Sequence, residues 1–162
     1  MALAVGLGTA LTSQERALRE GSARAADPFD VIVAAPGDRI SMLLAAVYLQ
    51  PTDAPLLGGA ALARLQGDAR IGLLAPIAFG DSMDGAPVVG STAGFVTHLG
   101  AMAAGRVFAA EDEAVAGALS PRQVGDHFTP THGDGADEDA GAHDGHSFQI
   151  TGKMAPTGSP WD

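Results

Sequence analysis

The sequence predicts an α+β fold. Most segments with apolar residues at helical spacing come early in the chain, and most short apolar runs bounded by turn residues come after Arg70. Helices followed by strands are the order typical of this class, and a split α/β layout is the alternative. The 162 residues contain no internal repeat and are enough for one domain with a real core.

The N-terminal segment 1–11 is apolar and is followed by a polar segment. It is too short to span a bilayer, which needs about 20 apolar residues, and it lacks the basic residues that open a signal peptide. It is interpreted as a core helix, an expression leader or the end of a longer transmembrane helix. Thr12 and Glu15 fit a capping box, which predicts that a short polar helix begins there and ends near Gly21 or Ala26.

The next elements alternate between strand and helix. Residues 29–36 are apolar and rich in β-branched side chains, which predicts a buried strand. Residues 40–49 predict a helix. A further helix is expected around Leu62 and Leu65, which lie at helical spacing, with Gly67 as its stop.

Strand signals dominate the second half of the chain. Residues 70–80 and 85–96 are apolar runs on either side of the turn signal Asp-Ser-Met-Asp-Gly, which predicts a β-hairpin. Residues 105–119 fit either a helix or a strand. Residues 124–128 are expected to turn into a strand, and residues 146–156 to form another.

Charge and composition exclude several functions. The net charge is −10, and the small number of Lys and Arg side chains argues against binding to nucleic acid or to an anionic membrane surface. The absence of cysteine excludes thiol nucleophiles, Cys-ligated zinc and disulfides.

No catalytic motif is found. The sequence has no P-loop, no dinucleotide-binding fingerprint and no G-x-S-x-G nucleophile motif. Ser91 with His98 is a conceivable nucleophile and base, and Ser41 a conceivable nucleophile, but no acid is placed beside them. The sequence therefore predicts a protein that is not an enzyme.

A stretch of Gly, Asp and His at 131–148 is the one candidate binding site. Neutral imidazole and carboxylate oxygens are good zinc ligands, and calcium fits less well because the EF-hand spacing is broken. The alternative is a solvated acidic loop that binds nothing. The candidate ligands are His127, His132, His143, Asp144 and His146.

Several motifs resemble the extracytoplasmic domain of FtsX/MacB-type ABC transporter permeases. They are the Val-Gly-Asp turn at 124–126, His132-Gly133, the histidines of 143–146, and the segment Pro-Thr-Gly-Ser-Pro-Trp-Asp at 156–162, which is the most specific. Residues 29–48 and 73–96 are similar to the opening strand, turn and helix of that domain and to its central strands.

The resemblance implies a domain organisation. It covers residues 27–162 as an α+β domain of the MacB periplasmic core type, with a larger βαβ-like lobe, a smaller mostly-β lobe and the His-rich loop at 131–147. Residues 1–26 would be the end of a first transmembrane helix and a polar linker, and the chain would be a fragment truncated at both ends. Residues 111–122 depart from the family pattern because they are shortened.

The resemblance also implies a function. The chain would be a non-catalytic permease domain at the bacterial inner membrane, facing the periplasm or the cell exterior. It would couple ATP-driven motion to the handling of a substrate. Its expected partners are a cytoplasmic ABC ATPase subunit, an accessory periplasmic protein and a second permease copy, with no nucleic acid. No cofactor is required, and zinc is the one candidate. The alternative is a soluble zinc-binding module that uses the His-rich loop.

Overall fold

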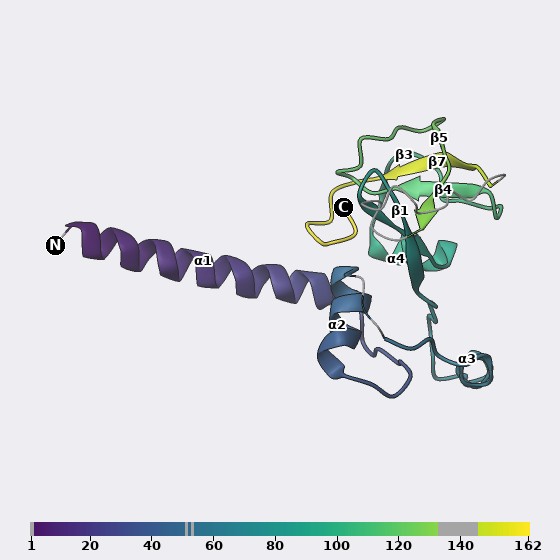
Figure 1. Ribbon diagram of the computed structural model, residues 1–162, viewed down its shortest axis with the longest axis horizontal. Helices are drawn as coiled ribbons and strands as arrows, with labels where there is room; N and C mark the ends of the chain where they lie inside the picture. Colours follow the sequence, from purple (N-terminus) through teal and green to yellow (C-terminus); the bar gives the residue numbers. More distant parts are fainter. Residues whose placement is uncertain (1, 51, 53, 133–145) are drawn as a thin grey trace.

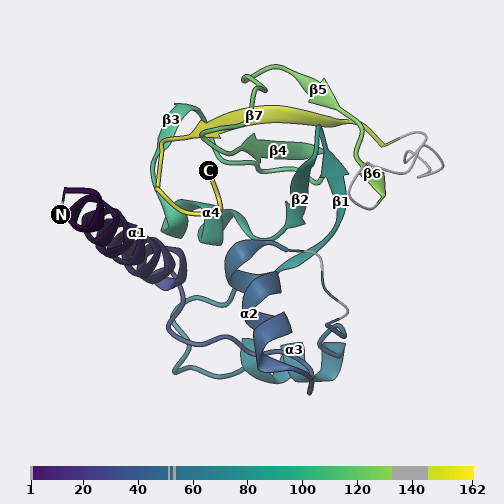
Figure 2. The same cartoon turned by 60° about the vertical axis from the view of Figure 1, so that its left-hand side comes forward.

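The computed structural model describes residues 2–50, 52, 54–132 and 146–162 (Figure 1). Four helices and seven strands are found in them, so the predicted α+β class is confirmed. The first helix, α1 (Ala2–Ala26), projects from the body that the other elements form (Figure 1). In a view turned by 60°, α2 and α3 lie below the strands, and α4 lies between these helices and the strands (Figure 2).

Helix α1 is continuous over 25 residues, so the prediction of a helix start at Thr12 is wrong. The Thr12 hydroxyl instead donates a hydrogen bond to the carbonyl oxygen of Gly8 at 2.7 Å, as hydroxyls inside a helix often do. Glu15 pairs with Arg19 one turn later. Among the described residues, no helix has both the length and the hydropathy needed to cross a bilayer.

The predicted second and third helices are confirmed. Helix α2 (Arg39–Tyr48) starts at the cap residue Asp38, whose carboxylate accepts a hydrogen bond from the Ser41 amide at 2.9 Å. Helix α3 (Gly59–Gln66) ends at Gly67, as predicted. The predicted strand at 29–36 is wrong, because these residues form no strand.

The first sheet contains the predicted hairpin. Strand β1 (Ala78–Met83) pairs antiparallel with β2 (Ala86–Gly90), and β6 (Thr131–His132) pairs with the other edge of β1. Asp84 and Gly85 form the two-residue turn, with φ of 52° and 78°. These are the positive φ values of a type I′ turn, which Asp-Gly favours.

Helix α4 (Ala93–Leu99) replaces the end of the predicted second hairpin strand. Its cap is Thr92, whose hydroxyl accepts a hydrogen bond from the Phe95 amide at 3.2 Å. The helix connects the first sheet to the second (Figure 2).

The second sheet is built around β7 (Phe148–Met154), a predicted strand that is confirmed. Strand β4 (Glu113–Ala116) runs parallel to it, and β3 (Met102–Gly105) and β5 (His127–Phe128) run antiparallel to it. The ambiguous segment at 105–119 thus contains a strand rather than a helix.

The hydrophobic core lies between the two sheets. Its best buried residue is Ile150 in β7, which is 2% exposed. The core combines buried side chains of the second sheet with half-buried side chains of both sheets; it consists of Ala116, Phe128 and Ile150, with Met83, Val88, Ala114 and Phe148 packed against them.

A second, aromatic cluster lies at α4. Phe95 is 3% exposed, and its ring contacts Phe29 and His98 and meets Trp161 edge to face at 5.2 Å between ring centres. These contacts join the segment after α1, helix α4 and the C-terminal loop.

Candidate functional site

Two of the candidate ligands that the structure describes, His127 and His146, lie near the start of β7. His127 in β5 pairs with Gln149 on one edge of β7, and Glu113 in β4 pairs with the same residue on the other edge. His146 lies two residues before the strand begins. His127 and His146 are both exposed.

An open depression of about 350 Å³ lies beside this end of β7. It is lined by Glu111, Asp112, His146, Ser147 and Phe148. The backbone amide of Gln149 donates a hydrogen bond to the carbonyl oxygen of Asp112 at 2.8 Å. This bond holds the acidic segment against the strand. The depression is therefore lined by two exposed carboxylates and one exposed imidazole, which do not form a three-ligand metal group.

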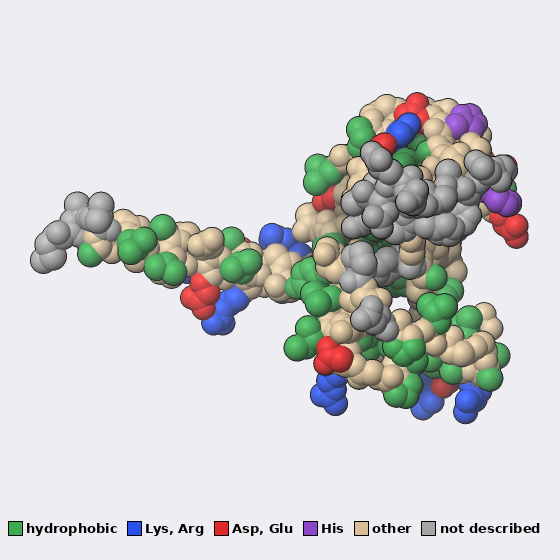
Figure 3. All heavy atoms as spheres, in the orientation of Figure 1, with side chains coloured by type: hydrophobic (Ala, Val, Ile, Leu, Met, Phe, Trp, Pro, Cys, Tyr) green, Lys and Arg blue, Asp and Glu red, His purple; other side chains and the backbone are tan. Residues whose placement is uncertain are grey.

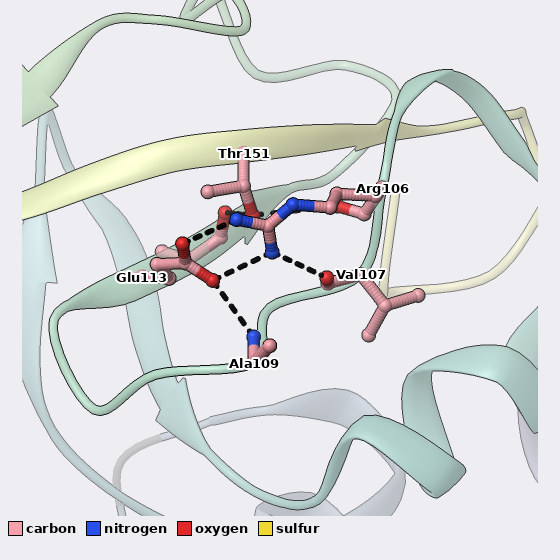
Figure 4. Close-up of polar contacts among 6 residues, drawn as sticks. Arg106, Val107, Ala109, Glu113 and Thr151 are labelled. Carbon is pink, nitrogen blue, oxygen red and sulfur yellow. Dashed lines mark hydrogen bonds and ion pairs between the residues drawn. The ribbon is translucent and has the colours of Figure 1, made fainter.

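The segment that carries Glu111 and Asp112 is held by an ion pair (Figure 4). The guanidinium of Arg106 donates to both carboxylate oxygens of Glu113, at 2.5 and 2.7 Å, and also to the carbonyl oxygen of Val107 at 3.1 Å. The amide of Ala109 donates to Glu113 as well, at 2.7 Å. The loop from β3 to β4 is thus closed on itself.

This ion pair changes the acidity of Glu113. The hydrogen bonds from Arg106, followed by the one from the Ala109 amide, lower the pKa of Glu113 to about 2. The carboxylate is therefore ionised at neutral pH, and its two oxygens are already occupied by donors. Glu113 supports the depression and is not available as a ligand in it.

The remaining candidate ligands fall in other places. His132 pairs through its backbone with Asp81 in the first sheet. His143 and Asp144 lie outside the described residues. No three His, Asp or Glu side chains come together as metal ligands in the described part of the chain. The structure thus brings His127 and His146 to one end of β7 and places His132 in the first sheet, whereas His143 and Asp144 lie outside its described residues.

Sequence reasoning missed Glu111 and Asp112 as lining residues. The signal was present as the acidic run at 111–113 immediately before an apolar segment. The carboxylates of Glu111 and Asp112 favour a cation over an anion in the depression.

Ser91 and His98 do not form a nucleophile and base. They lie at opposite ends of α4, and seven residues of helix correspond to about 10 Å along the axis. The Nε2 atom of His98 is 3.1 Å from the carbonyl oxygen of Pro28. The Ser91 hydroxyl is buried and has no hydrogen-bond partner within the described segments.

The C-terminal loop, residues 156–162, is folded around one carboxylate. Asp162 accepts hydrogen bonds at 2.7 Å from the amide and hydroxyl of Thr157 and from the amide of Gly158. Burial raises the pKa of Asp162, but these hydrogen bonds outweigh it and hold the pKa below its ordinary value. The carbonyl oxygen of Asp162 also accepts a hydrogen bond from the Leu119 amide.

No family model, curated protein or solved structure matches this chain. The resemblance to FtsX/MacB-type permeases therefore rests on the sequence motifs alone.

Proposed function

We propose that this chain is a non-catalytic extracytoplasmic domain of an ABC transporter permease, which couples ATP-driven motion to the handling of a substrate or accessory protein. The single observation that carries the proposal is the junction between α1 and the C-terminal loop. That loop holds the most specific motif of the resemblance, and it lies beside the base of the projecting helix.

The junction is visible in the contacts of Gly158. A Cβ atom built on Gly158 would lie 3.7 Å from Nε of Arg24, so the loop passes close to the last turn of α1. Ala25, in the same turn, is buried. The base of α1 is therefore packed against the body, whereas its outer part is exposed.

The loop is itself joined to the body. Trp161 packs on Phe95 of α4, and Asp162 accepts a hydrogen bond from Leu119 just after β4. A displacement of α1 would thus reach both α4 and the second sheet through one ordered loop. This is the connection that a domain moved by a helix from the membrane requires.

The proposal predicts which side of the membrane the body faces. Leu119 is 82% exposed and the chain has no cysteine, so Leu119→Cys introduces one accessible thiol. In cells that express the gene, a membrane-impermeant maleimide should label the variant without permeabilisation, and the unsubstituted protein serves as the control. The labelled protein should also co-precipitate an ATP-binding subunit.

Two outcomes would contradict the transport role. One is labelling that needs permeabilised cells. The other is recovery of the protein in the soluble fraction with no ATP-binding subunit attached. Either result would favour the second candidate function.

The second candidate is a zinc-binding module, and the depression with His146, Glu111 and Asp112 favours it. Its test is a zinc titration by calorimetry on the chain and on the variant with His132, His143 and His146 changed to Ala. Micromolar binding at pH 7.5 that is lost in the variant, and weakened at pH 5.5 as imidazoles protonate, would support it. His98→Ala, outside the candidate set, should bind as the parent does. Equal heat from parent and triple variant would exclude His132, His143 and His146 as ligands.

A further inference from the structure

Segment 31–35, between α1 and α2, has the composition of a strand but no strand beside it. It reads Val-Ile-Val-Ala-Ala and begins with three β-branched residues, the type most enriched in strands. Residues 31–34 contain no helix, turn or bend. Among the described residues, none of its backbone amide or carbonyl groups takes part in a hydrogen bond. The segment therefore offers a row of unpaired donors and acceptors, as the edge strand of a sheet does.

The first three side chains of segment 31–35 alternate between solvent and the body. Val31 and Val33 are 77% and 51% exposed, whereas Ile32 between them is half-buried. Successive side chains of a strand point to opposite faces, so this is the exposure pattern of a strand with one face on the body. A second strand laid beside the segment would cover part of the exposed face and leave Ile32 in place.

Further apolar side chains lie near segment 31–35. The chain after it approaches Pro55, because a Cβ atom built on Gly37 would be 3.7 Å from Cδ of Pro55. Next to these two residues in the sequence, Leu56 is 83% exposed, and Ile40 in the first turn of α2 is 66% exposed. Figure 3 shows hydrophobic side chains at the surface of the lower part of the body, where α2 and α3 lie. An occupant of segment 31–35 would therefore meet a largely apolar surface.

Carboxylates flank segment 31–35. Asp27 and Asp30 precede it, and neither has an ion pair among the described residues. Asp38 follows it and caps α2. The whole chain has a net charge of −10. Basic groups at the ends of an occupant would therefore be attracted, and acidic groups would be repelled.

We propose that segment 31–35 binds an extended peptide segment of another protein, which adds to it as a β-strand and carries basic residues beside an apolar centre. Backbone hydrogen bonds supply the affinity in this mode of recognition. Val31 and Val33 pair with β-branched side chains of the peptide, and its Lys or Arg side chains lie near Asp27 and Asp30. The inference rests on segment 31–35 and its neighbours and does not depend on the proposed transport role.

The exposed area sets the strength of this binding. An apolar side chain of this size buries on the order of 100 Å², so Val31, Val33, Ile40 and Leu56 together offer roughly 280 Å² of apolar surface. About 57% of an ordinary interface is apolar, so the whole interface would bury roughly 1,000 Å² over both partners. Interfaces below about 1,200 Å² belong to weak, transient complexes. The dissociation constant should therefore lie between about 10 µM and 1 mM.

The test is the exchange of the amide hydrogens of segment 31–35, followed by mass spectrometry on the whole chain. The probe is the peptide acetyl-Lys-Thr-Val-Thr-Val-Thr-Lys-amide, whose affinity is measured by fluorescence anisotropy of a labelled copy. The amides should exchange fast in the chain alone and about tenfold more slowly when about nine-tenths of the chain is occupied. Exchange in β7, in the second sheet, is the internal control and should not change.

Two altered peptides separate backbone pairing from charge. When every backbone amide is N-methylated, the peptide keeps its side chains but cannot donate to the segment. Its dissociation constant should rise at least about tenfold. When Glu replaces both Lys residues, the peptide keeps its backbone and should bind about fivefold more weakly at low ionic strength. That difference should shrink in about 1 M salt, which screens exposed charges.

Substitutions in the chain locate the site. Neighbouring amides of a strand point to opposite sides, so at least one of Val31→Pro and Ile32→Pro removes a donor to the peptide and should raise the dissociation constant about tenfold. Val31→Thr keeps the amide and the β-branched shape, so it is the matched control and should bind as the parent does.

The charge contribution has its own pair of variants. Asp30→Asn should weaken binding of the Lys peptide, whereas Asp112→Asn, just before β4, should not. Circular dichroism would confirm that each variant is folded.

Five results would overturn the proposal. Slow exchange of the amides of segment 31–35 in the chain alone would mean that they are paired within it. Protection that rises with chain concentration, without peptide, would assign the segment to a second copy. Protection by phosphatidylcholine–phosphatidylglycerol vesicles but not by the peptide would assign it to a lipid surface. Equal binding of the N-methylated peptide would exclude strand pairing, and unchanged exchange at about 5 mM peptide would exclude binding in the expected range.

None of these results concerns the side of the membrane on which the body lies, so they are separable from a failure of the transport role.

Discussion

Arg106 and Glu113 form a two-point ion pair across the loop that joins β3 to β4. They are seven positions apart in the sequence, and the loop between them is closed by two further hydrogen bonds, from Arg106 to the carbonyl oxygen of Val107 and from the Ala109 amide to Glu113 (Figure 4). The hydroxyl of Thr151 in β7 donates a hydrogen bond to the carbonyl oxygen of Arg106. This contact fixes the ion-paired loop to the central strand. The acidic residues of the candidate site lie inside this loop.

The Arg106–Glu113 pair predicts a loss of stability in acid. The pKa of Glu113 is about 2 in the folded protein and near 4.5 in the unfolded chain. A lowered pKa stabilises the fold above pH 4.5, and that contribution is lost as the pH falls from 4.5 towards 2. Glu113→Gln should therefore be less stable than the parent at pH 7, and the difference should shrink by pH 2.5. Urea unfolding at both pH values measures it.

The matched control for this pair is Glu111→Gln, since Glu111 is a nearby exposed glutamate with no ion pair among those that the structure describes. It should unfold as the parent does at pH 7. A Glu113→Gln variant with the same deficit at pH 2.5 as at pH 7 would show that the ion pair is not the cause.

Gly152 is predicted to tolerate no side chain. A Cβ atom at this position would collide with the carbonyl oxygen of Arg106, where β3 and β7 approach closely. Gly152→Ala should lower the free energy of unfolding by about 2 kcal/mol, as overpacking does. Gly80→Ala, in an exposed part of β1 with open space around the new Cβ, is the control and should change it by much less. Thermal or urea unfolding compares the two.

The core between the sheets should depend on Ile150. Ile150→Ala removes a side chain that is 2% exposed and leaves a cavity, so the free energy of unfolding should fall by about 3 kcal/mol. Leu119→Ala, at a position 82% exposed, should change it by less than about 0.5 kcal/mol. A similar loss in both variants would mean that the core lies elsewhere.

The C-terminal loop can be followed through Trp161, the only tryptophan of the chain. Thr157→Val removes the hydroxyl that donates to Asp162 and should loosen the loop, so that Trp161 leaves Phe95 and its fluorescence shifts to longer wavelength. Thr129→Val, at an exposed threonine, should leave the emission unchanged. Unshifted emission in Thr157→Val would show that the hydroxyl does not hold the loop.

Local signals account for the elements that the sequence predicted correctly. The stop at Gly67 and the Asp84-Gly85 turn each act within four residues, so they can be read without knowing the fold. The hairpin turn was predicted across five residues, and only its last two form it, because the strand β1 extends to Met83.

The errors have a common physical cause. Residues 29–36 have the composition of a strand, but a strand needs a neighbour to pair with, and none lies beside them in the described structure. Thr12 is a residue type that often caps helices, but the residues before it are already helical. Its hydroxyl therefore donates a hydrogen bond to the carbonyl oxygen of Gly8. At Thr92 a real cap starts α4 where a strand was expected.

The candidate site could be predicted only in part. Its histidines were visible as ligand-type residues, but Glu111 and Asp112 join His146 only because β4 runs parallel to β7. The Arg106–Glu113 ion pair depends on the path of a loop, and the spacing of residues in the sequence does not predict that path. Those contacts are set by strand pairing between distant segments.

The length of α1 has a mechanical consequence. Its 25 residues correspond to about 38 Å along the axis, and only its last turn is packed on the body. A rotation of 10° about that base would move the far end through about 7 Å, given this length. The helix is thus a lever arm with its fulcrum at Ala25, and small rotations at the base are amplified at the tip.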